Sequence, residues 1–445
     1  MKTPICDFAE SYSKKNPIRL HMPGHKGVGL LGMEKTDITE FDGADSLYHA
    51  DGIIFDSENN AGKLFGCRTF YSAEGSSLCI RAMLYLLAMY AKSQGMKPVV
   101  AAGRNVHKTF LSSAAMLDID VKWLYGKKNK SYLSCDITAS ELEAVIESDE
   151  EKITAVYLTA PDYLGNMADI SAISRICKKH GVLLAVDNAH GAYLKFLPQS
   201  QHPIDLGAEI CCDSAHKTLP TLTGGAYLHI SDSAPKMFAD YAKEAMEFFG
   251  STSPSYLILQ SLDKTNHYLE SYGERLADFV PKVEQLKREL VLLGYDLYGD
   301  EPLKITVQPK SYGYTGTELA NILATKNIFC EFADSDFMVM MFTPENKDDV
   351  FSDLVAIFTS VPIREPIRSR QPEFHQPERK MTIREAAFSQ SEEVNVDESI
   401  GRIVSNITIS CPPAVPIIMC GEVVDEKVLE CFKYYNIEKI SVVKE

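Results

Sequence analysis

The stretch "AEICCDSAHKTLP" (residues 208–220) changes character halfway along. It begins as a short apolar run and continues as a polar segment in which Lys217 directly follows His216. Short apolar runs are typical of strands buried on both faces of a sheet. A lysine that follows such a strand is costly to bury unless its charge is offset. Because a lysine held in a pocket can form an imine with an aldehyde, the segment predicts either a covalent anchor or, alternatively, a surface lysine on a loop.

Further apolar runs precede this one, and helical stretches separate them. Strands that alternate with helices predict a parallel sheet covered on both faces, with catalytic groups beyond the carboxyl ends of its strands. A helix expected at 76–93 is apolar on more than one face and therefore buried. The expected strands are 98–102, 153–160, 182–187 and 208–214, and the separating helices include 139–148 and 169–180.

The composition divides the chain into four parts. Residues 1–70, rich in Gly, His and Asp, are expected to form loops and short helices, and residues 71–265 form the large α/β domain. Residues 266–370 predict a small α/β domain, and a proline-rich linker lies around its end. Residues 371–445 predict a short C-terminal domain with a helix, the turn-rich "CPPAVP" (411–416) and a final helix.

The chain has 445 residues and a formal net charge of −16. This charge argues against nucleic-acid binding and against attraction to anionic membranes, because both rely on basic patches. The eleven cysteines show no CxxC spacing and are expected to be reduced thiols. The N-terminus has no apolar core of a signal peptide, and no apolar run approaches the ~20 residues that span a bilayer. We therefore expect a cytoplasmic protein.

Pyridoxal phosphate is the usual aldehyde for a lysine imine. Its site needs a carboxylate at the pyridine nitrogen, an anion-binding segment for the phosphate and a flat group over the ring. Asp187, at the end of the run 182–187, is the candidate carboxylate, and a turn or helix-cap aspartate is the alternative. His107, in "GRNVHKT" (103–109), is the candidate for stacking on the ring, and a solvated loop histidine is the alternative.

The segment "SAEGSS" (72–77) leads directly into the helix expected at 76–93. Gly75 allows a close backbone approach, and the helix N-terminus offers free N–H groups to an anion. The hydroxyl groups nearby and a histidine add donors, and an ordinary helix cap is the alternative explanation. The predicted phosphate contacts are Gly75, Ser76, Ser77, Ser214 and His216.

These motifs occur in an order that resembles the Orn/Lys/Arg decarboxylases, the pyridoxal-phosphate-dependent, fold-type-I decarboxylases of basic amino acids. The resemblance runs from about His21 to Ser360 and continues more weakly through 401–403 and 411–422. It implies an aminotransferase-like large domain with a mostly parallel sheet, in a short form without an N-terminal wing domain. The matching segments are "HMPGHKG" (21–27), "GRNVHKT" (103–109), "APDYLGN" (160–166), "VDNAHGAY" (186–193), "SAHKTLPTLTGGAYLH" (214–229) and "STSPSYLILQSLD" (251–263).

The resemblance implies roles for individual residues. Lys217 forms the imine with the cofactor, and Asp187 pairs with the pyridine nitrogen. His107 stacks on the ring, and His190 lies near the phenolic side of the ring or near the reacting carbon. The phosphate is held by Ser76, Ser77, Ser214 and His216.

The resemblance also implies a homodimer with shared active sites, which can assemble further into a higher oligomer. Thr252, expected to contact the cofactor, and Ser253, expected to contact the substrate, reach the site of the partner subunit. His25 and Glu422 are further substrate contacts, with Glu422 binding a distal ammonium or guanidinium group.

The resemblance predicts decarboxylation of arginine, lysine or ornithine to the corresponding amine and CO2. Cys411-Pro412-Pro413-Ala414 stands where the family has Tyr-Pro-Pro-Gly, which leaves the substrate open. An aminotransferase on the same scaffold is one alternative, and its carboxylate-binding arginine would come from Arg364, Arg368 or Arg370. A regulatory protein that binds pyridoxal phosphate without turnover is a second alternative, and an α/β protein without the cofactor is a third.

Overall fold

The computed structural model describes residues 1–126, 131–148, 151–369, 371–407, 409–411 and 415–444. The chain forms two compact units, each built from two segments. The first unit comprises Met1–Gly95 and Cys177–Leu276, and the second comprises Met96–Ile176 and Ala277–Glu445. Within the described ranges, every helix is too short or too polar to cross a membrane.

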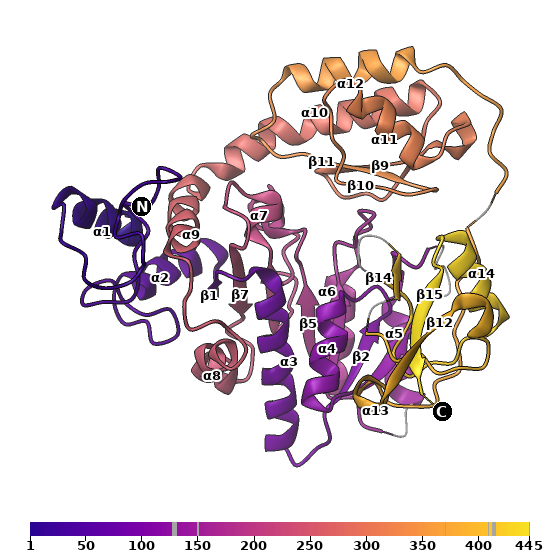
Figure 1. The fold of residues 1–445 in the computed structure, drawn as a ribbon, viewed down its shortest axis with the longest axis horizontal. Helices are drawn as coiled ribbons and strands as arrows, with labels where there is room; N and C mark the ends of the chain where they lie inside the picture. Colours follow the sequence, from indigo (N-terminus) through magenta and orange to yellow (C-terminus); the bar gives the residue numbers. More distant parts are fainter. Residues whose placement is uncertain (127–130, 149–150, 370, 408, 412–414, 445) are drawn as a thin grey trace. The chain divides into compact units, whose positions relative to one another are not determined.

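A seven-stranded sheet has the strand order β1-β7-β6-β5-β4-β2-β3 (Figure 1). The pairs β5–β6, β2–β4 and β2–β3 are parallel, whereas β7 runs antiparallel to both β1 and β6. The predicted mostly parallel sheet is therefore confirmed. Its strands are β1 (Arg68–Ser72), β2 (Val99–Gly103), β3 (Asp120–Leu124), β4 (Ala155–Thr159), β5 (Leu183–Asp187), β6 (Ile210–Asp213) and β7 (Ala226–Ile230).

In the first unit, helix α3 (Gly75–Ser93) packs against β1, β6 and β7. Helix α8 (Lys236–Glu247) covers α3, and this second neighbour explains why α3 is apolar around most of its circumference. Helices α2 (Ile53–Phe65) and α9 (Tyr256–Leu269) pack on β1, and Phe65 contacts the ring of His229 at 4.4 Å. The first unit also contains α1 (Pro4–Lys14), the 3-10 helix η1 (Ala192–Phe196) and the one-turn helix α7 (Ala215–Thr218).

In the second unit, a four-stranded antiparallel sheet has the order β10-β11-β9-β8. It accounts for the small α/β layer that the sequence predicts between 302 and 358. Its strands are β8 (Asp296–Tyr298), β9 (Lys304–Gln308), β10 (Phe332–Ala333) and β11 (Met338–Met341). The other elements of this unit are α4 (Lys108–Leu117), α5 (Ala139–Ser148), η2 (Pro309–Tyr312), α11 (Gly316–Ala324) and α12 (Asp349–Ser360). Helices α6 (Ile170–His180) and α10 (Tyr272–Leu292) each include a boundary between the units.

The C-terminal region departs from the prediction in one respect. Helix α14 (Glu426–Tyr434) exists, but strand β15 (Lys439–Val443) follows it and pairs with β12 (Ser391–Asn395), so the predicted final helix is not the last element. The reason lies in the residues: Ile440 and Val442 alternate with polar neighbours and are buried in a core with Val428 and Phe432. The remaining elements are α13 (Ile383–Phe388), η3 (Val396–Glu398), β13 (Ile409–Cys411) and β14 (Val415–Ile418).

Candidate active site

Lys217 lies in α7, which begins two residues after the end of β6. Its Nζ atom is 3.1 Å from Nε2 of His190, a residue of the loop that follows β5. Two residues that are distant in sequence but were both expected at the reaction centre therefore share a hydrogen bond. The amine is directed at His190 and not into bulk water. A covalent anchor requires such an enclosed position.

Asp187 is the last residue of β5, and its side chain is buried. Its Oδ1 atom accepts a hydrogen bond from the backbone N–H of Ala189 at 3.2 Å and from the thiol of Cys212 at 3.5 Å. Both donors are neutral, and they fix the direction of the buried carboxylate at the end of β5.

A second group of predicted residues meets at the N-terminus of α3. Gly75 adopts φ +69° and donates its N–H to the carbonyl of Gly224 at 2.7 Å. The hydroxyl of Ser214 donates to the hydroxyl of Ser76 at 2.8 Å. A Cβ atom added to Gly75 would lie 3.9 Å from Cε1 of His216, so the imidazole lies beside this turn. The first turn of a 19-residue helix and two serine hydroxyls form an anion-binding arrangement, with the imidazole of His216 beside it.

His216 has a defined protonation pattern. Its Nδ1 atom lies 3.0 Å from the carbonyl oxygen of Gly225, so Nδ1 carries the proton and donates it. Burial lowers the pKa of His216 below its ordinary value of 6.5. The imidazole is therefore neutral near pH 7, with Nδ1 as the donor.

The donor set fits pyridoxal phosphate. Lys217 offers an amine for the aldehyde, Asp187 offers a buried carboxylate for the pyridine nitrogen, and the start of α3 offers donors for the phosphate. All of these residues belong to the first unit, so the fit does not depend on how the two units are arranged.

Other predicted residues lie in different surroundings. His107 is the N-cap of α4, and its Nδ1 accepts the backbone N–H of Thr109. His25 pairs with Asp37 through Nε2 at 3.1 Å. Thr252 and Ser253 are exposed in the turn that precedes α9.

Glu422 was expected to bind a distal substrate cation, but the structure gives its carboxylate protein partners. Oε2 accepts a hydrogen bond from Nη2 of Arg104 at 3.0 Å and from the backbone N–H of Met419 at 2.9 Å, and Oε1 pairs with the other guanidinium nitrogen. Both Arg104 and Glu422 are buried. The element Cys411-Pro412-Pro413-Ala414, which was also linked to the substrate, lies largely outside the described residues.

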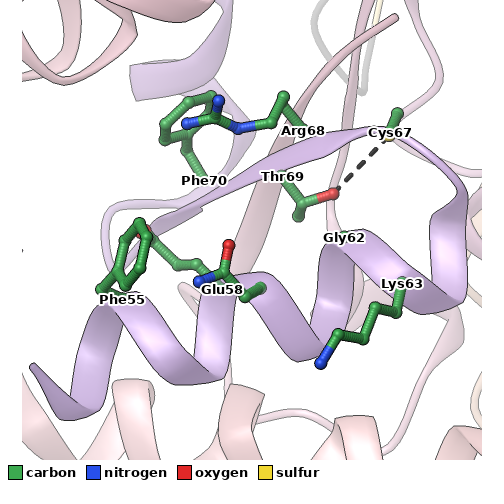
Figure 2. Close-up of a pocket in the computed structure, with 9 residues that line it drawn as sticks. Phe55, Glu58, Gly62, Lys63, Cys67, Arg68, Thr69 and Phe70 are labelled. Carbon is green, nitrogen blue, oxygen red and sulfur yellow. Dashed lines mark hydrogen bonds between the residues drawn. The ribbon is translucent and has the colours of Figure 1, made fainter. Parts of the chain in front are cut away.

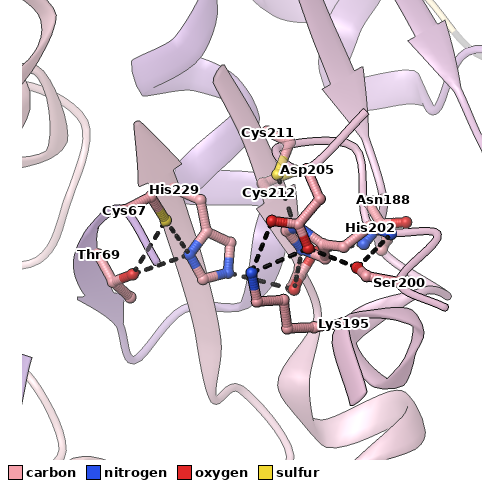
Figure 3. Close-up of polar contacts among 12 residues, drawn as sticks. Cys67, Thr69, Asn188, Lys195, Ser200, His202, Asp205, Cys211, Cys212 and His229 are labelled. Carbon is pink, nitrogen blue, oxygen red and sulfur yellow. Dashed lines mark hydrogen bonds and ion pairs between the residues drawn. The ribbon is translucent and has the colours of Figure 1, made fainter. Parts of the chain in front are cut away.

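A buried polar cluster lies on the face of the sheet opposite Asp187, and no motif in the sequence predicts it. Asp213 accepts hydrogen bonds from His202, His229 and Asn188, and all four side chains are inaccessible to solvent. Figure 3 shows the two histidines and Asn188 converging from different elements. The one available signal was Asp213 itself, an acidic residue at the end of an apolar strand and directly before Ser-x-His-Lys.

Solved structures share the fold of this chain. Lysine decarboxylase A from Pseudomonas aeruginosa has a TM-score of 0.83 at 17% sequence identity, over 99% of this chain and 80% of that chain. Serine palmitoyltransferase from Sphingomonas wittichii has a TM-score of 0.59 at 14% identity, over 79% of this chain and 82% of that chain. The fold and the donor set together define a pyridoxal-phosphate-dependent enzyme of fold type I.

The family follows from the sequence. The model described as Orn/Lys/Arg decarboxylase, major domain, matches residues 3–294, and the model of the C-terminal domain of that family matches residues 369–441. The chain belongs to the Orn/Lys/Arg decarboxylase family, which confirms the resemblance read from its motifs. It is a pyridoxal-phosphate-dependent decarboxylase, and its substrate is a basic amino acid.

Two curated relatives cover nearly the whole chain. The protein named arginine decarboxylase from Bacillus subtilis (strain 168) is 27% identical over 462 residues, which cover 96% of this chain and 92% of the relative. The protein named uncharacterized protein YaaO from the same organism is 27% identical over 454 residues, which cover 95% and 92%.

Proposed function

We propose that this enzyme decarboxylates arginine, with lysine and ornithine as the alternative substrates. Several relatives named arginine decarboxylase match 94–98% of this chain. The relative named lysine decarboxylase LdcA matches 52% of it. The extent of the match therefore supports arginine ahead of lysine.

The contact between Lys217 Nζ and His190 Nε2 carries the proposal for the chemistry. Pyridoxal phosphate, when bound, supplies the electron sink that makes loss of CO2 from the substrate feasible. Lys217 Nζ is the anchor for the aldehyde and the acid that returns a proton to Cα of the substrate. His190 orients that ammonium group through Nε2 and shares its proton.

The other predicted residues would bind and orient the cofactor, and all of them except His107 belong to the first unit. Asp187 holds a proton on the pyridine nitrogen, and the N–H of Ala189 and thiol of Cys212 fix the direction of its carboxylate. Ser76, Ser77 and Ser214 would donate to the phosphate at the start of α3, where the helix dipole favours an anion. His216 lies beside this turn and would donate to the phosphate through Nε2 only on gaining a second proton, because its Nδ1 proton is held by Gly225. His107 stacks on the ring, with Nδ1 held by the first turn of α4.

The predicted substrate contacts differ in how far the protein already occupies them. Glu422 would have to leave Arg104 to bind a substrate cation, and an unpaired Arg104 would then remain buried, which is strongly unfavourable. Ser253 and His25 are therefore the better candidates among the predicted substrate contacts. His25 is partly exposed and carries Asp37 beside it, so that pair offers a carboxylate for a guanidinium group.

We also propose a homodimer with shared active sites. Residues 18–31 expose large apolar side chains on the first unit, including Ile18, Leu20, Leu30 and Leu31, which are 82–92% exposed. Clusters of this kind mark protein interfaces. Thr252 and Ser253, which are exposed as well, would reach the cofactor and substrate of the partner subunit.

A reducing compartment is consistent with the cysteines. The ten cysteines for which the structure describes a side chain are all free thiols, and most are buried. Persistent free thiols are typical of cytosolic proteins. We therefore propose that the enzyme works in the cytoplasm.

The test of the proposed function is CO2 release from a panel of amino acids with pyridoxal phosphate present. Release from arginine, with agmatine as the product, is expected to exceed release from lysine and ornithine. Turnover that yields cadaverine or putrescine instead would replace arginine as the substrate. Formation of alanine from pyruvate without CO2 release would indicate an aminotransferase and contradict the proposal.

A further inference from the structure

Asp213 is a fully buried carboxylate with three side-chain donors. Its Oδ2 atom lies 3.1 Å from Nε2 of His202 and 3.2 Å from Nε2 of His229, and its Oδ1 accepts the side-chain N–H of Asn188 at 2.7 Å. Burial alone would raise the pKa of Asp213, but the two histidines lower it well below the ordinary value of 3.8. A permanent negative charge therefore lies inside the first unit.

The strand register places this charge behind the sheet. Cys211 and Thr69 are each paired with His229, so Asp213, two residues along β6 from Cys211, shares their face. Asp187 is paired with Cys212 and therefore belongs to the opposite face. Asn188, the residue after Asp187, directs its side chain to the face of Asp213. The carboxylates of Asp187 and Asp213 therefore lie on opposite faces of the sheet.

A hydrogen-bonded cluster explains these residues better than a metal site does. Donor atoms of His202, Cys211 and Asp213 lie within 4.8 Å of one another, a spacing that a metal ion could use. However, Oδ2 of Asp213 already receives two imidazole contacts at hydrogen-bond distance, and its Oδ1 accepts the side-chain N–H of Asn188, so the carboxylate is fully used by protein donors.

The contact with Asn188 joins two catalytic segments. Asn188 belongs to the loop after β5 that carries His190, and Asp213 directly precedes the turn that carries Lys217. The backbone adds a second link, because the N–H of Asn188 donates to the carbonyl of Cys212 at 3.0 Å. The Asn188 side chain also needs Gly191, since a Cβ atom there would lie 2.0 Å from Oδ1 of Asn188.

We infer that Asp213 is a positioning residue that, through Asn188, ties the loop after β5 to the start of α7. This tie sets the spacing between the Asp187 carboxylate and the Lys217 amine, and it rests on the roles proposed for those two groups. The two segments are also linked by the contact between Lys217 and His190 and by the backbone hydrogen bond from Asn188 to Cys212, but the Asn188–Asp213 tie is the one formed by two fully buried side chains.

The far edge of the cluster reaches a surface cavity. Oγ1 of Thr69 lies 2.9 Å from Nδ1 of His229. Thr69 also lines a cavity of about 340 Å³, together with Cys67, Arg68 and Phe70. Figure 2 shows the Thr69 hydroxyl beside the Cys67 sulfur in this cavity. Asp213 is therefore connected through His229 and Thr69 to this cavity, and not to the proposed cofactor site.

Three variants test the tie. Asn188→Ala removes the donor, Gly191→Ala displaces the Asn188 side chain without changing a polar group, and Asp213→Asn removes the charge. Asp263→Asn is the matched control, because Asp263 is equally buried in the same unit and also accepts three hydrogen bonds, from Ile5, Cys6 and Ser57. The control is expected to lower the melting temperature and to leave the site intact.

The first measurement uses the protein without cofactor. Hydrogen–deuterium exchange is expected to increase in both 188–193 and 214–219 in each of the three variants, and in neither segment in Asp263→Asn. An increase in only one segment, or none beyond that of the control, would overturn the inference. This outcome is independent of whether Lys217 proves to be the anchor.

The second measurement uses the holoenzyme. Each variant is expected to bind pyridoxal phosphate about tenfold or more weakly by equilibrium dialysis, the effect of one lost hydrogen bond to a buried charge. The value of kcat is expected to fall more than KM rises, because the tie orients catalytic groups rather than the substrate. Wild-type affinity and kcat together with a lowered melting temperature would assign Asp213 a purely structural role.

A reciprocal exchange completes the test. In Asn188→Asp with Asp213→Asn, the amide and carboxylate change places, so the hydrogen bond reforms with its polarity reversed. Recovery of exchange protection in both segments is expected relative to Asp213→Asn alone. Failure to recover, or an equimolar metal ion in the purified wild-type protein that Asp213→Asn removes, would contradict the tie.

Discussion

Lys217 illustrates how a single residue acquires its chemistry from its position. Because α7 starts as soon as β6 ends, the lysine remains close to the strand ends and reaches His190 rather than the surface. The motif around it was local in sequence, so its role could be predicted. The partners of Asp213 could not be predicted. His202 and His229 are isolated histidines in the sequence, and only the folded sheet brings both of them to Asp213.

Replacing Lys217 tests the anchor directly. Lys217→Ala and Lys217→Arg are both expected to lose the visible absorbance of the attached cofactor, because neither side chain forms an imine with the aldehyde. Arginine keeps the positive charge and so serves as the matched control for electrostatics. A visible band and full turnover in either variant, measured by absorbance and CO2 release, would contradict the assignment.

Replacing His190 separates anchoring from proton transfer. His190→Gln is expected to keep the visible band and to lower kcat by about 10²-fold or more, the usual effect of losing an acid–base group. The measurement is kcat across pH in comparison with the wild type. An unchanged kcat would show that His190 has no part in moving the proton.

Helix α3 shows how an element can prepare a binding site. Its first residue, Gly75, has φ +69°, and its apolar faces are buried between the sheet and α8. This helix was predicted because it is long and strongly apolar. Strands β1 and β7 were missed, since "RTFYS" (68–72) and "AYLHI" (226–230) mix polar and apolar residues and read as loops without their partners.

The two ends of α3 offer a matched pair of glycine variants. Gly75→Ala and Gly95→Ala both introduce a Cβ atom at φ of +69° and +70°, so each should lower the free energy of unfolding by about 1–2 kcal/mol. Only Gly75 lies at the proposed phosphate site. We expect Gly75→Ala to weaken pyridoxal phosphate binding by about tenfold and Gly95→Ala to leave it unchanged, as measured by equilibrium dialysis alongside chemical denaturation. Equal cofactor affinities would place the phosphate elsewhere.

At the scale of the whole molecule, buried histidines and buried aspartates make the stability of the fold change with pH in opposite directions. Burial lowers the pKa values of His216 and His229 below 6.5, whereas it raises that of Asp162 to about 7 and that of Asp334 to about 6. The neutral histidines stabilise the fold fully above pH 6.5, and this stability is lost as the pH falls. The protonated Asp162 and Asp334 contribute their full stability to the fold below pH 3.8. This contribution is lost as the pH rises through about 6 for Asp334 and about 7 for Asp162.

The contribution of His229 can be isolated by substitution. His229 faces Asp213, His202, Thr69 and Cys67, and the unfolded chain binds a proton at this histidine more readily than the folded chain does. The difference in melting temperature between the wild type and His229→Gln is therefore expected to shrink as the pH falls from 7.5 to 5.5. Calorimetry on the protein without cofactor measures it, and a difference that grows over this range would contradict the assigned direction.

The proposed dimer predicts a clear effect of surface charge. Leu30→Glu with Leu31→Glu is expected to give a monomer with little activity, because the exposed apolar residues would no longer be buried against a second copy. Leu292→Glu, at a leucine that is 86% exposed in the second unit, is the matched control and should remain dimeric. Light scattering after size exclusion gives the masses, and a dimer that persists in the double variant would move the interface elsewhere.

The antiparallel strand β7 has a consequence for synthesis of the protein. The edge strand β1 pairs with β7, with Arg68 opposite Ile230 and Ser72 opposite Ala226. A ribosome adds about 5–20 residues per second, so β1 emerges many seconds before its partner exists. Any nascent chain that stalls before residue 226 leaves the backbone of β1 without its ladder, and such truncated products are expected to be substrates for chaperones and proteases.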